Sequence, residues 1–348
     1  MWSVRPKTVT GRGVLAWTVA GVLAVGLAGI LALGTGPTPL GWRGVLGEVL
    51  GEKLAGGSLD PTERAILADI RLPRVLLTGV VGMGLAVSGM VLQSLLRNPL
   101  AEPFVLGISS GAALGALSSM ALGAGFLPFT TPLAAFLGAM GTMALVLGIA
   151  GGRGRLEMTR VLLTGVIVNA FFTSLIMLIL SLSRAEQLHS MMFWLYGDLS
   201  SARYAHIGFV GPGALVALAI LWSQARSLNI LGLGERTAMQ LGVEVDKTRL
   251  LLLVVTALLT GLVVSVSGLI GFVGLIVPHL IRMLLGPDHR LLLPVGALAG
   301  AAFLILADAM ARTVISPAEI PVGVVTAALG APFFILLLRT KGARWNPF

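Results

Sequence analysis

The feature that most constrains this chain is a series of about ten apolar segments separated by short polar stretches. A helix needs roughly 20 predominantly apolar residues to cross the hydrocarbon of a bilayer. The segments are 13–34, 72–96, 103–124, 130–150, 159–182, 206–224, 248–268, 269–285, 291–311 and 320–339. We therefore predict an all-α, polytopic membrane protein that forms a single transmembrane domain over residues 1–348.

The composition supports this prediction and excludes several other classes. Hydrophobic residues make up 56% of the chain and charged residues only 11%, whereas soluble domains carry about 25% charged residues. Glycine is abundant, with 46 residues, as suits helices that pack closely in lipid. The chain has no cysteine, which excludes disulfides and thiolate chemistry.

The seventh and eighth segments meet without a polar loop. We expect Ser265, Ser267 and Gly268 to form the turn between them. The eighth segment is short and contains Pro278 followed by His279, so it is expected to be broken or partly re-entrant.

Two other apolar stretches allow more than one interpretation. The first segment follows basic residues, as a signal peptide would, but its apolar part is longer than a signal core of 7–15 residues, so we favour a retained helix. Residues 188–200 are too few to span. We expect them to form an interfacial helix, with Trp194 and Tyr196 at the level of the lipid headgroups.

The distribution of charge gives the chain a direction. Ten helices place both termini on one side, and the loops of that side hold most of the Lys and Arg residues. Positive residues concentrate in cytoplasmic loops, so both termini are predicted to be cytoplasmic. The net charge of +9 then needs no nucleic acid to explain it. Residues of this set are Arg5, Lys7, Arg12, Arg97, Arg160, Arg226, Arg236, Lys247 and Arg339.

A weak internal repeat is present. Residues 84–89 read GLAVSG and residues 261–265 read GLVVS. An odd number of helices lies between them, so the two copies would be inverted, as is common in transporters.

Several functional groups are missing from the sequence. The phosphate-binding pattern G-x-x-x-x-G-K-[ST] does not occur, so the chain lacks the loop with which ATPases of this type bind the phosphates of ATP. Asp308 is the main intramembrane carboxylate, and Arg312 one turn later favours a local ion pair over a proton site. His279 after Pro278 favours a contact at a helix break over a metal ligand. We find no nucleophile with a base and no metal cluster, so an enzyme is not expected and energy must come from a partner.

A set of motifs in a fixed order resembles the FecCD/BtuC-type, or type II, family of ABC importer permeases, over about residues 60–340. The motifs are Arg71-Leu-Pro-Arg74, Asn98-Pro-Leu-Ala-Glu-Pro103, Gly107-Ile-Ser-Ser-Gly111, Leu233-Gly-Glu-Arg-Thr-Ala-Met-Gln-Leu-Gly242, Gly271-Phe-Val-Gly-Leu-Ile-Val-Pro-His279, Asp288-His-Arg-Leu-Leu-Leu-Pro294, Ala307-Asp-Ala-Met-Ala-Arg312, Glu319-Ile-Pro-Val-Gly323 and Gly330-Ala-Pro332.

The resemblance implies a homodimer of ten-helix subunits with an inverted repeat in the cytoplasmic (inner) membrane. Two cytoplasmic ABC ATPase subunits would bind ATP and Mg²⁺, so no cofactor is expected on this chain. A periplasmic or surface-tethered substrate-binding protein would dock on the other side.

Three external arginines, Arg71, Arg74 and Arg312, match those that bind acidic residues of the binding protein in the family. Two-fold symmetry would match two lobes to two permeases, through charge-assisted contacts. The alternative is that these side chains snorkel to the headgroups.

The cytoplasmic loop 228–245 matches the family's coupling helix, which sits in a groove of the ATPase. The alternative is an ordinary interfacial amphipathic helix. The residues that the match assigns to coupling are Leu233, Gly234, Glu235, Arg236, Ala238, Leu241 and Gly242.

The turn at Asn98 and Leu100 corresponds to a cytoplasmic constriction, or gate, in similar permeases. Met158 and Thr159 are expected to form a second one. The alternative for Asn98 is the N-cap of the next helix.

The substrate pathway is expected to follow the dimer axis along the fifth segment. Thr164, Asn169, Thr173 and Ser174 would give it a weakly polar lining. Such residues can equally bridge helices within one subunit, and the sequence leaves both readings open.

The sequence therefore predicts the membrane-spanning subunit of an ATP-driven importer. An iron chelate, either a siderophore complex or haem, is the expected cargo. Cobalamin is the alternative, and a small oxyanion such as molybdate is a third. The competing classes are an ion-driven secondary carrier and a membrane-embedded enzyme.

Overall fold

The computed structural model describes residues 11–38, 40–51, 59–123, 129–151 and 156–341, and within these ranges the chain forms helices and no strands. Arg5 and Lys7, which contributed to the charge distribution, lie outside the described residues. The elements are α1 (Gly11–Gly34), α2 (Trp42–Leu50), α4 (Pro61–Ala65), η1 (Ile66–Arg71), α5 (Leu72–Leu96), η2 (Pro103–Leu106), α6 (Ile108–Ala121), α7 (Thr130–Ala150), α8 (Met158–Leu182), α9 (Ala185–Tyr196), α10 (Tyr204–Ser223), α11 (Ala225–Gly232), α12 (Glu235–Gln240), α13 (Val245–Ser267), α14 (Val273–Leu285), α15 (His289–Thr313) and α16 (Val322–Lys341).

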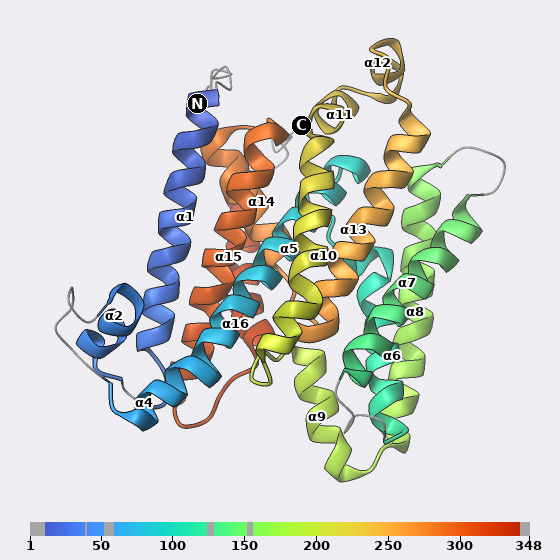
Figure 1. The fold of residues 1–348 in the computed structure, drawn as a ribbon. Coiled ribbons are helices and arrows are strands. Elements are labelled where there is room, and N and C mark those ends of the chain that lie inside the picture. The colour runs from blue at the N-terminus through green and yellow to red at the C-terminus, as the bar shows by residue number, and fades with distance from the viewer. Residues whose placement is uncertain (1–10, 39, 52–58, 124–128, 152–155, 342–348) are drawn as a thin grey trace.

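The predicted membrane-spanning segments are confirmed as helices. Within the described residues, 7 helices are long and apolar enough to cross a bilayer, and the three shorter apolar helices are α6, α14 and α16. The first turn of α1 lies at the same end of the bundle as α11 and α12 (Figure 1). We call this end the α12 end, and the opposite end, which carries α2, α4 and α9, the α9 end.

Three long helices, α5, α13 and α15, form the centre of the bundle. Most of each is buried inside the protein, whereas α8, α10 and α1 are mostly exposed. A helix that is apolar all round can be buried on every side, which explains why a hydrophobic α5 tolerates its central place. The first helix, α1, packs along α15, with Gly21 facing Leu298.

Glycines allow the central helices to approach until their backbones touch. A Cβ atom on Gly82 of α5 would overlap the backbone of Gly300 on α15, and one on Gly89 of α5 would overlap Gly274 on α14. Small residues favour such contacts in membranes because association there depends on close packing rather than on exclusion of water. These two contacts fix α5 against both of its neighbours.

Two of the predicted spans are shorter than expected. The segment predicted as 103–124 begins as a 3-10 turn, η2, and its helix α6 starts only at Ile108, after Gly107 with φ 78°. The predicted segment 269–285 starts at Val273, after Phe272 with φ 67°. Helices of 14 and 13 residues extend about 20 Å, less than the ~30 Å hydrocarbon thickness. The eighth segment is short, as expected, but α14 continues through Pro278 and His279 without a break. The turn before it was also placed wrongly, because Ser265 and Ser267 lie in α13 and the turn is formed by 268–272. The continuous helix over 103–124 was wrong.

The long helix, break and short helix occur twice, in opposite directions. One copy is α5, η2 and α6, and the other is α13, residues 268–272 and α14. The two copies touch near the sequences that suggested the repeat, because Thr260, the residue before 261–265, donates a hydrogen bond from Oγ1 to Ser88 Oγ at 3.0 Å. The arrangement agrees with the predicted inverted repeat.

The predicted interfacial helix is α9, but one of its aromatic residues was placed wrongly. Tyr196 is exposed, as expected, whereas Trp194 is buried in the main hydrophobic core. The carbonyl oxygen of Trp194 accepts a hydrogen bond from the amide of Leu269 at 3.3 Å. The side chain is buried because α9 turns back onto the end of α13 instead of lying alone at the surface.

The contact between Gly89 and Gly274 gives a first prediction. Gly89→Val inserts a side chain where a backbone lies, and overpacking of this kind costs about 1–3 kcal/mol or more. We expect a lower melting temperature in detergent and a smaller folded fraction on gel filtration.

The matched control is Gly141→Val on α7, where an added Cβ meets nothing within 4 Å. This variant should melt like the wild type. Equal melting temperatures for the two variants would show that the α5–α14 contact does not limit stability.

Candidate functional site

Helix α8 presents a long exposed face that is almost free of charge. Its large exposed side chains include Ile167, Phe171 and Met177, at 68%, 58% and 64% exposure. The single charged residue within the helix is Arg160, in the first turn. In the described part of the chain no other helix covers this face, so α8 meets lipid, a second subunit or a solute there.

The polar residues predicted to line the pathway all lie on α8. Thr173 and Ser174 are exposed, and Thr164 and Asn169 are half-buried. The hydroxyl of Thr173 donates to the carbonyl of Asn169 at 2.7 Å, and that of Ser174 donates to Ala170 at 3.1 Å. Because these two hydroxyls bond within α8, they do not bridge helices of the same subunit.

The predicted gate residue Asn98 shapes a turn at the α12 end. Its side-chain oxygen accepts the amide of Leu100 at 3.0 Å. Arg97, just before it, ends α5 in the left-handed conformation, with φ 47°. The alternative role of Asn98 as an N-cap was wrong, because the next helical residue is Pro103. The turn leaves the side chain of Leu100 exposed by 43%.

The second predicted gate lies at the start of α8. Met158 is the first residue of the helix and packs against the main core, while Thr159 is exposed. Neither side chain is charged, but the exposed pair of Arg160 and Glu157, 2.9 Å apart, lies beside them at this end of α8.

One acidic residue next to the gate turn was missed by the sequence analysis. The carboxylate of Glu102 accepts a hydrogen bond from the backbone amide of Phe272, the residue before α14, and burial raises the pKa of Glu102 to about 7. A carboxylate between Pro99 and Pro103 was the available signal. The contact joins the turn after α5 to the break before α14.

The segment predicted to couple to the ATPase contains a helix, which starts where expected, at Glu235. It is α12, flanked by Gly234 with φ 123° and Gly242 with φ 81°. These conformations favour glycine, since other residues are strained at positive φ. Leu233 and Leu241 are exposed by 68% and 59%, and together they present an apolar surface at the end of the molecule.

Ala238 does not belong to that surface. Its side chain is fully buried against the rest of the chain, so the small residue serves packing of α12 and not close approach of a partner. The sequence analysis missed Met239, which is 48% exposed. Arg236 is exposed, whereas Glu235 pairs with Arg249 of α13 at 3.3 Å.

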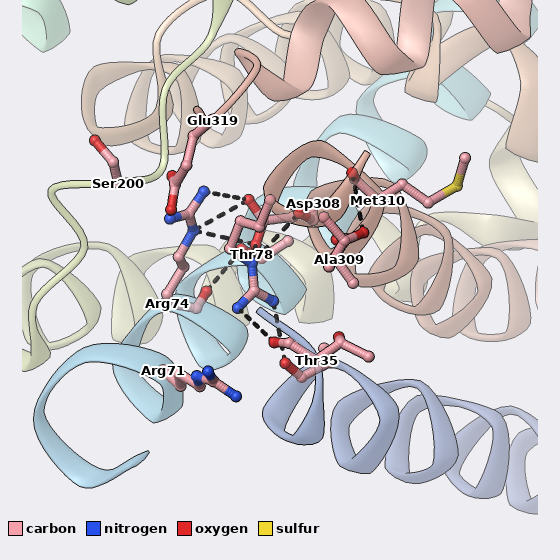
Figure 2. A network of polar contacts seen from close by, with 12 residues as sticks. Thr35, Arg71, Arg74, Thr78, Ser200, Asp308, Ala309, Met310 and Glu319 are labelled. Carbon is pink, nitrogen blue, oxygen red and sulfur yellow. Dashed lines mark hydrogen bonds and ion pairs between the residues drawn. The ribbon is translucent and has the colours of Figure 1, made fainter. Parts of the chain in front are cut away.

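At the α9 end, two of the three predicted docking arginines share one carboxylate. Nε and Nη2 of Arg74 donate to Asp308 at 3.1 and 3.0 Å, and Nη1 donates to Glu319 at 2.8 Å. Arg312 pairs with the same Asp308 at 3.1 Å, which confirms the ion pair predicted one helical turn apart. Figure 2 shows Arg74 with its contacts to Asp308 and Glu319.

Arginines of this cluster also bind the end of α1. Arg71 donates to the carbonyls of Leu33 and Thr38. Arg312 donates to Ala32 at 3.2 Å and Thr35 at 3.4 Å. The last carbonyls of a helix lack partners within the helix, so the two cations complete the C-terminus of α1 and complement its negative dipole end.

The three arginines are therefore buried. Arg71, Arg74 and Arg312 are exposed by only 4%, 6% and 3%. Snorkelling does not describe them, because their guanidinium groups point at carbonyls and carboxylates of the protein. Docking through them stays a prediction, and within this chain their charges hold α1, α5 and α15 together. The group of this cluster nearest the surface is Glu319, whose side chain is 33% exposed.

Among the described residues, no group of three or more His, Cys, Asp or Glu side chains could hold a metal ion. The ring of His279 lies beside those of Phe333 and Phe334, with centroids 5.9 and 6.1 Å away. The expected contact at a helix break was wrong, because His279 lies inside the continuous helix α14.

The cluster at Asp308 gives a second prediction. Asp308→Asn keeps the shape but leaves Arg74 and Arg312 without their shared charge, and breaking a buried pair costs about 3–5 kcal/mol. We expect a marked loss of thermal stability in detergent.

Glu48→Gln is the control, because Glu48 pairs with Arg64 at 3.2 Å on the surface and exposed pairs contribute about 0–1 kcal/mol. If both variants had the same melting temperature, the buried cluster would not determine the stability of the α9 end.

The chain is similar to known proteins in sequence and in structure. The FecCD transport family matches residues 23–340. The chain is 44% identical to the cobalamin import system permease protein BtuC of Halobacterium salinarum, covering 81% of this chain and 76% of the relative. It is also 44% identical to the hemin transport system permease protein HmuU of Yersinia pestis, covering 80% and 85%.

A solved structure described as an inward-facing conformation of a metal-chelate type ABC transporter has the same fold. The TM-score is 0.82 at 34% sequence identity, over 92% of this chain and 98% of the other. The family match, the relatives and the shared fold point to the same class of protein. This chain belongs to the FecCD transport family and is a multi-pass permease of the type II ABC importer class.

Proposed function

We propose that this permease forms a homodimer that imports an iron chelate, either a siderophore complex or haem, across the cytoplasmic membrane. Two ATPase subunits bind at the α12 end, which faces the cytoplasm together with the termini. A substrate-binding protein delivers the cargo at the α9 end. ATP and Mg²⁺ are bound by the ATPase and not by this chain.

The observation that carries the proposal is the uncharged, exposed face of α8. Two copies placed around a two-fold axis would present the same patch to each other, with Thr164, Asn169, Thr173 and Ser174 among apolar side chains. A large amphipathic chelate passes such a surface without a fixed charge that would hold it. Specificity then rests mainly on the binding protein.

The α12 end supports an ATPase partner. Leu233, Met239 and Leu241 are exposed apolar residues on a short projecting segment, and such residues fit a groove of a neighbouring protein. The same end carries both proposed gates, the turn at Asn98 and Leu100 and the start of α8 at Met158 and Thr159.

At the α9 end, we propose that the binding protein docks over the arginine cluster. Five ionisable side chains lie there, three cations and two carboxylates, so the cluster keeps an excess positive charge: Arg71, Arg74, Arg312, Asp308 and Glu319. An acidic residue of the partner would compete with Glu319 for Arg74.

The shared carboxylate argues against an ion-driven carrier. A proton site needs a carboxylate that can lose its partner, and intramembrane acids of this kind are functional by default. Asp308 is instead held by two arginines. This favours transport driven by a partner over transport driven by a proton gradient.

The cargo is tested by uptake into proteoliposomes that contain the permease, its ATPase and its binding protein. We expect ATP-dependent uptake of radiolabelled haem or ferric siderophore, and an excess of the same unlabelled compound should compete with uptake of the label. A non-hydrolysable ATP analogue serves as control.

Uptake of cobalamin or molybdate alone would replace the cargo and keep the mechanism. Uptake driven by a proton gradient without ATP would overturn the proposal.

The ATPase contact is tested by the double substitution Leu233→Asp and Leu241→Asp. Two carboxylates on the exposed apolar surface would have to lose their water when the ATPase binds, which weakens the contact. We expect co-purification of the ATPase to fall by about tenfold or more, equivalent to about 1.4 kcal/mol in binding free energy. Leu122→Asp is the control. Leu122 follows the last residue of α6, next to α9 and away from the α12 surface, and is 84% exposed. Unchanged co-purification of the double variant would exclude this surface as the docking site.

A further inference from the structure

Arg97 joins the gate-bearing end of α5 to the segment that leads into α12. Its Nη2 donates a hydrogen bond to the carbonyl of Leu231, near the end of α11, at 2.9 Å. The last carbonyls of a helix have no partner within it, and a guanidinium is a strong donor for such groups. Arg97 directly precedes Asn98, so a shift of α11 reaches the turn through one side chain.

A buried contact through α15 supports the same connection. The amide of His289 donates to the side-chain oxygen of Asn229 on α11 at 2.9 Å. The imidazole lies 2.7 Å from the same oxygen through Nδ1 and 2.6 Å from Ser94 Oγ of α5 through Nε2. Thus α11 is fixed to the last turn of α5 by two independent routes.

Arg249 makes the corresponding connection to the second gate. Its guanidinium contacts the carboxylate of Glu235 on α12 at 3.3 Å through both terminal nitrogens, and Nη1 donates to the carbonyl of Leu156 at 3.5 Å. Leu156 lies two residues before Met158. The side chain of Arg249 is 12% exposed and that of Glu235 is 43% exposed, so only the arginine side of this bridge is shielded from solvent.

Another contact of α12 with the rest of the chain is the packing of the buried Ala238. The helix has six residues and glycines at positive φ on both sides, so its backbone can rotate with small strain. The glycines on both sides of α12 therefore do not form a rigid backbone connection. A movement of α12 is transmitted by side chains that contact neighbouring helices.

We propose that Arg97 and Arg249 are positioning residues that connect the ATPase-binding segment to the two gates. Arg97 connects it to Asn98 and Leu100, and Arg249 connects it to Met158 and Thr159. The inference rests on the proposed function of α12 and of the gates. Each arginine acts through the planar, forked guanidinium group. In Arg249 this group holds two partners, Glu235 and Leu156, and in Arg97 it directs one N–H at the carbonyl of Leu231.

The substitutions Arg97→Lys and Arg249→Lys test this inference, because they keep the charge and lose the fork. In the reconstituted complex, we expect basal ATP hydrolysis to stay within about twofold and cargo uptake to fall by about tenfold, as loss of a charge-assisted hydrogen bond implies. Arg12→Lys, an exposed arginine on α1, is the matched control.

A distance measurement separates transmission from stability. The chain has no cysteine, so Leu163→Cys gives one spin label per copy on the exposed face of α8. In the otherwise unchanged permease, ATP should shift the distance between the two labels. With Arg249→Lys the ATPase should still co-purify and this shift should be lost.

Two results would overturn the inference while leaving the proposed function intact. One is normal uptake with a normal distance shift in both lysine variants. The other is loss of ATPase binding or of thermal stability, which would make the arginines assembly residues. Absence of ATP-dependent uptake by the wild-type complex would instead overturn the proposed function itself.

Discussion

Hydrocarbon offers no hydrogen bonds, and this constraint determines where the chain can leave the helical conformation. Each unsatisfied backbone group in lipid costs several kcal/mol, so a break is stable only where another part of the protein supplies a partner. The carbonyl of Gly274 accepts the side-chain amide of Gln93 at 2.9 Å, and the amide of Leu269 donates to Trp194. The breaks before α6 and α14 therefore lie against α5, α8 and α9 and not against lipid.

Close backbone contact makes these partners reachable. Gln93 of α5 bonds to Gly274 because Gly89, one turn earlier, allows α14 to touch α5. The glycine contact and the satisfied carbonyl therefore depend on each other. The residue four positions after Gly274 is Pro278, which has no N–H to donate. The contact with Gln93 therefore gives the Gly274 carbonyl the partner that α14 itself lacks.

The helices could be predicted from the sequence because the average hydropathy of a segment decides whether it enters the membrane. The break at 103–107 could not, because its residues are as apolar as those of α6 and the residue it packs against, Gly165 of α8, is distant in the sequence. The same limit applies to the arginines. Their place at one end followed from segment order, but the burial of Arg74 depends on Asp308 and Glu319, which lie on other elements. Ala238 shows that a small residue alone does not tell which face it serves.

The two ends of the molecule are built for different amounts of motion. At the α9 end, Asp308 binds two arginines in a region shielded from water, where charge-assisted contacts are strong and costly to break. At the α12 end, a six-residue helix sits between two glycines at positive φ and is attached through single side chains. A displacement imposed on α12 therefore meets little resistance locally and is transmitted mainly through those side chains. The buried Asp308 cluster holds α5 and α15 in place at the α9 end. A displacement of α12 should therefore move the helices mainly at the α12 end, where both proposed gates lie.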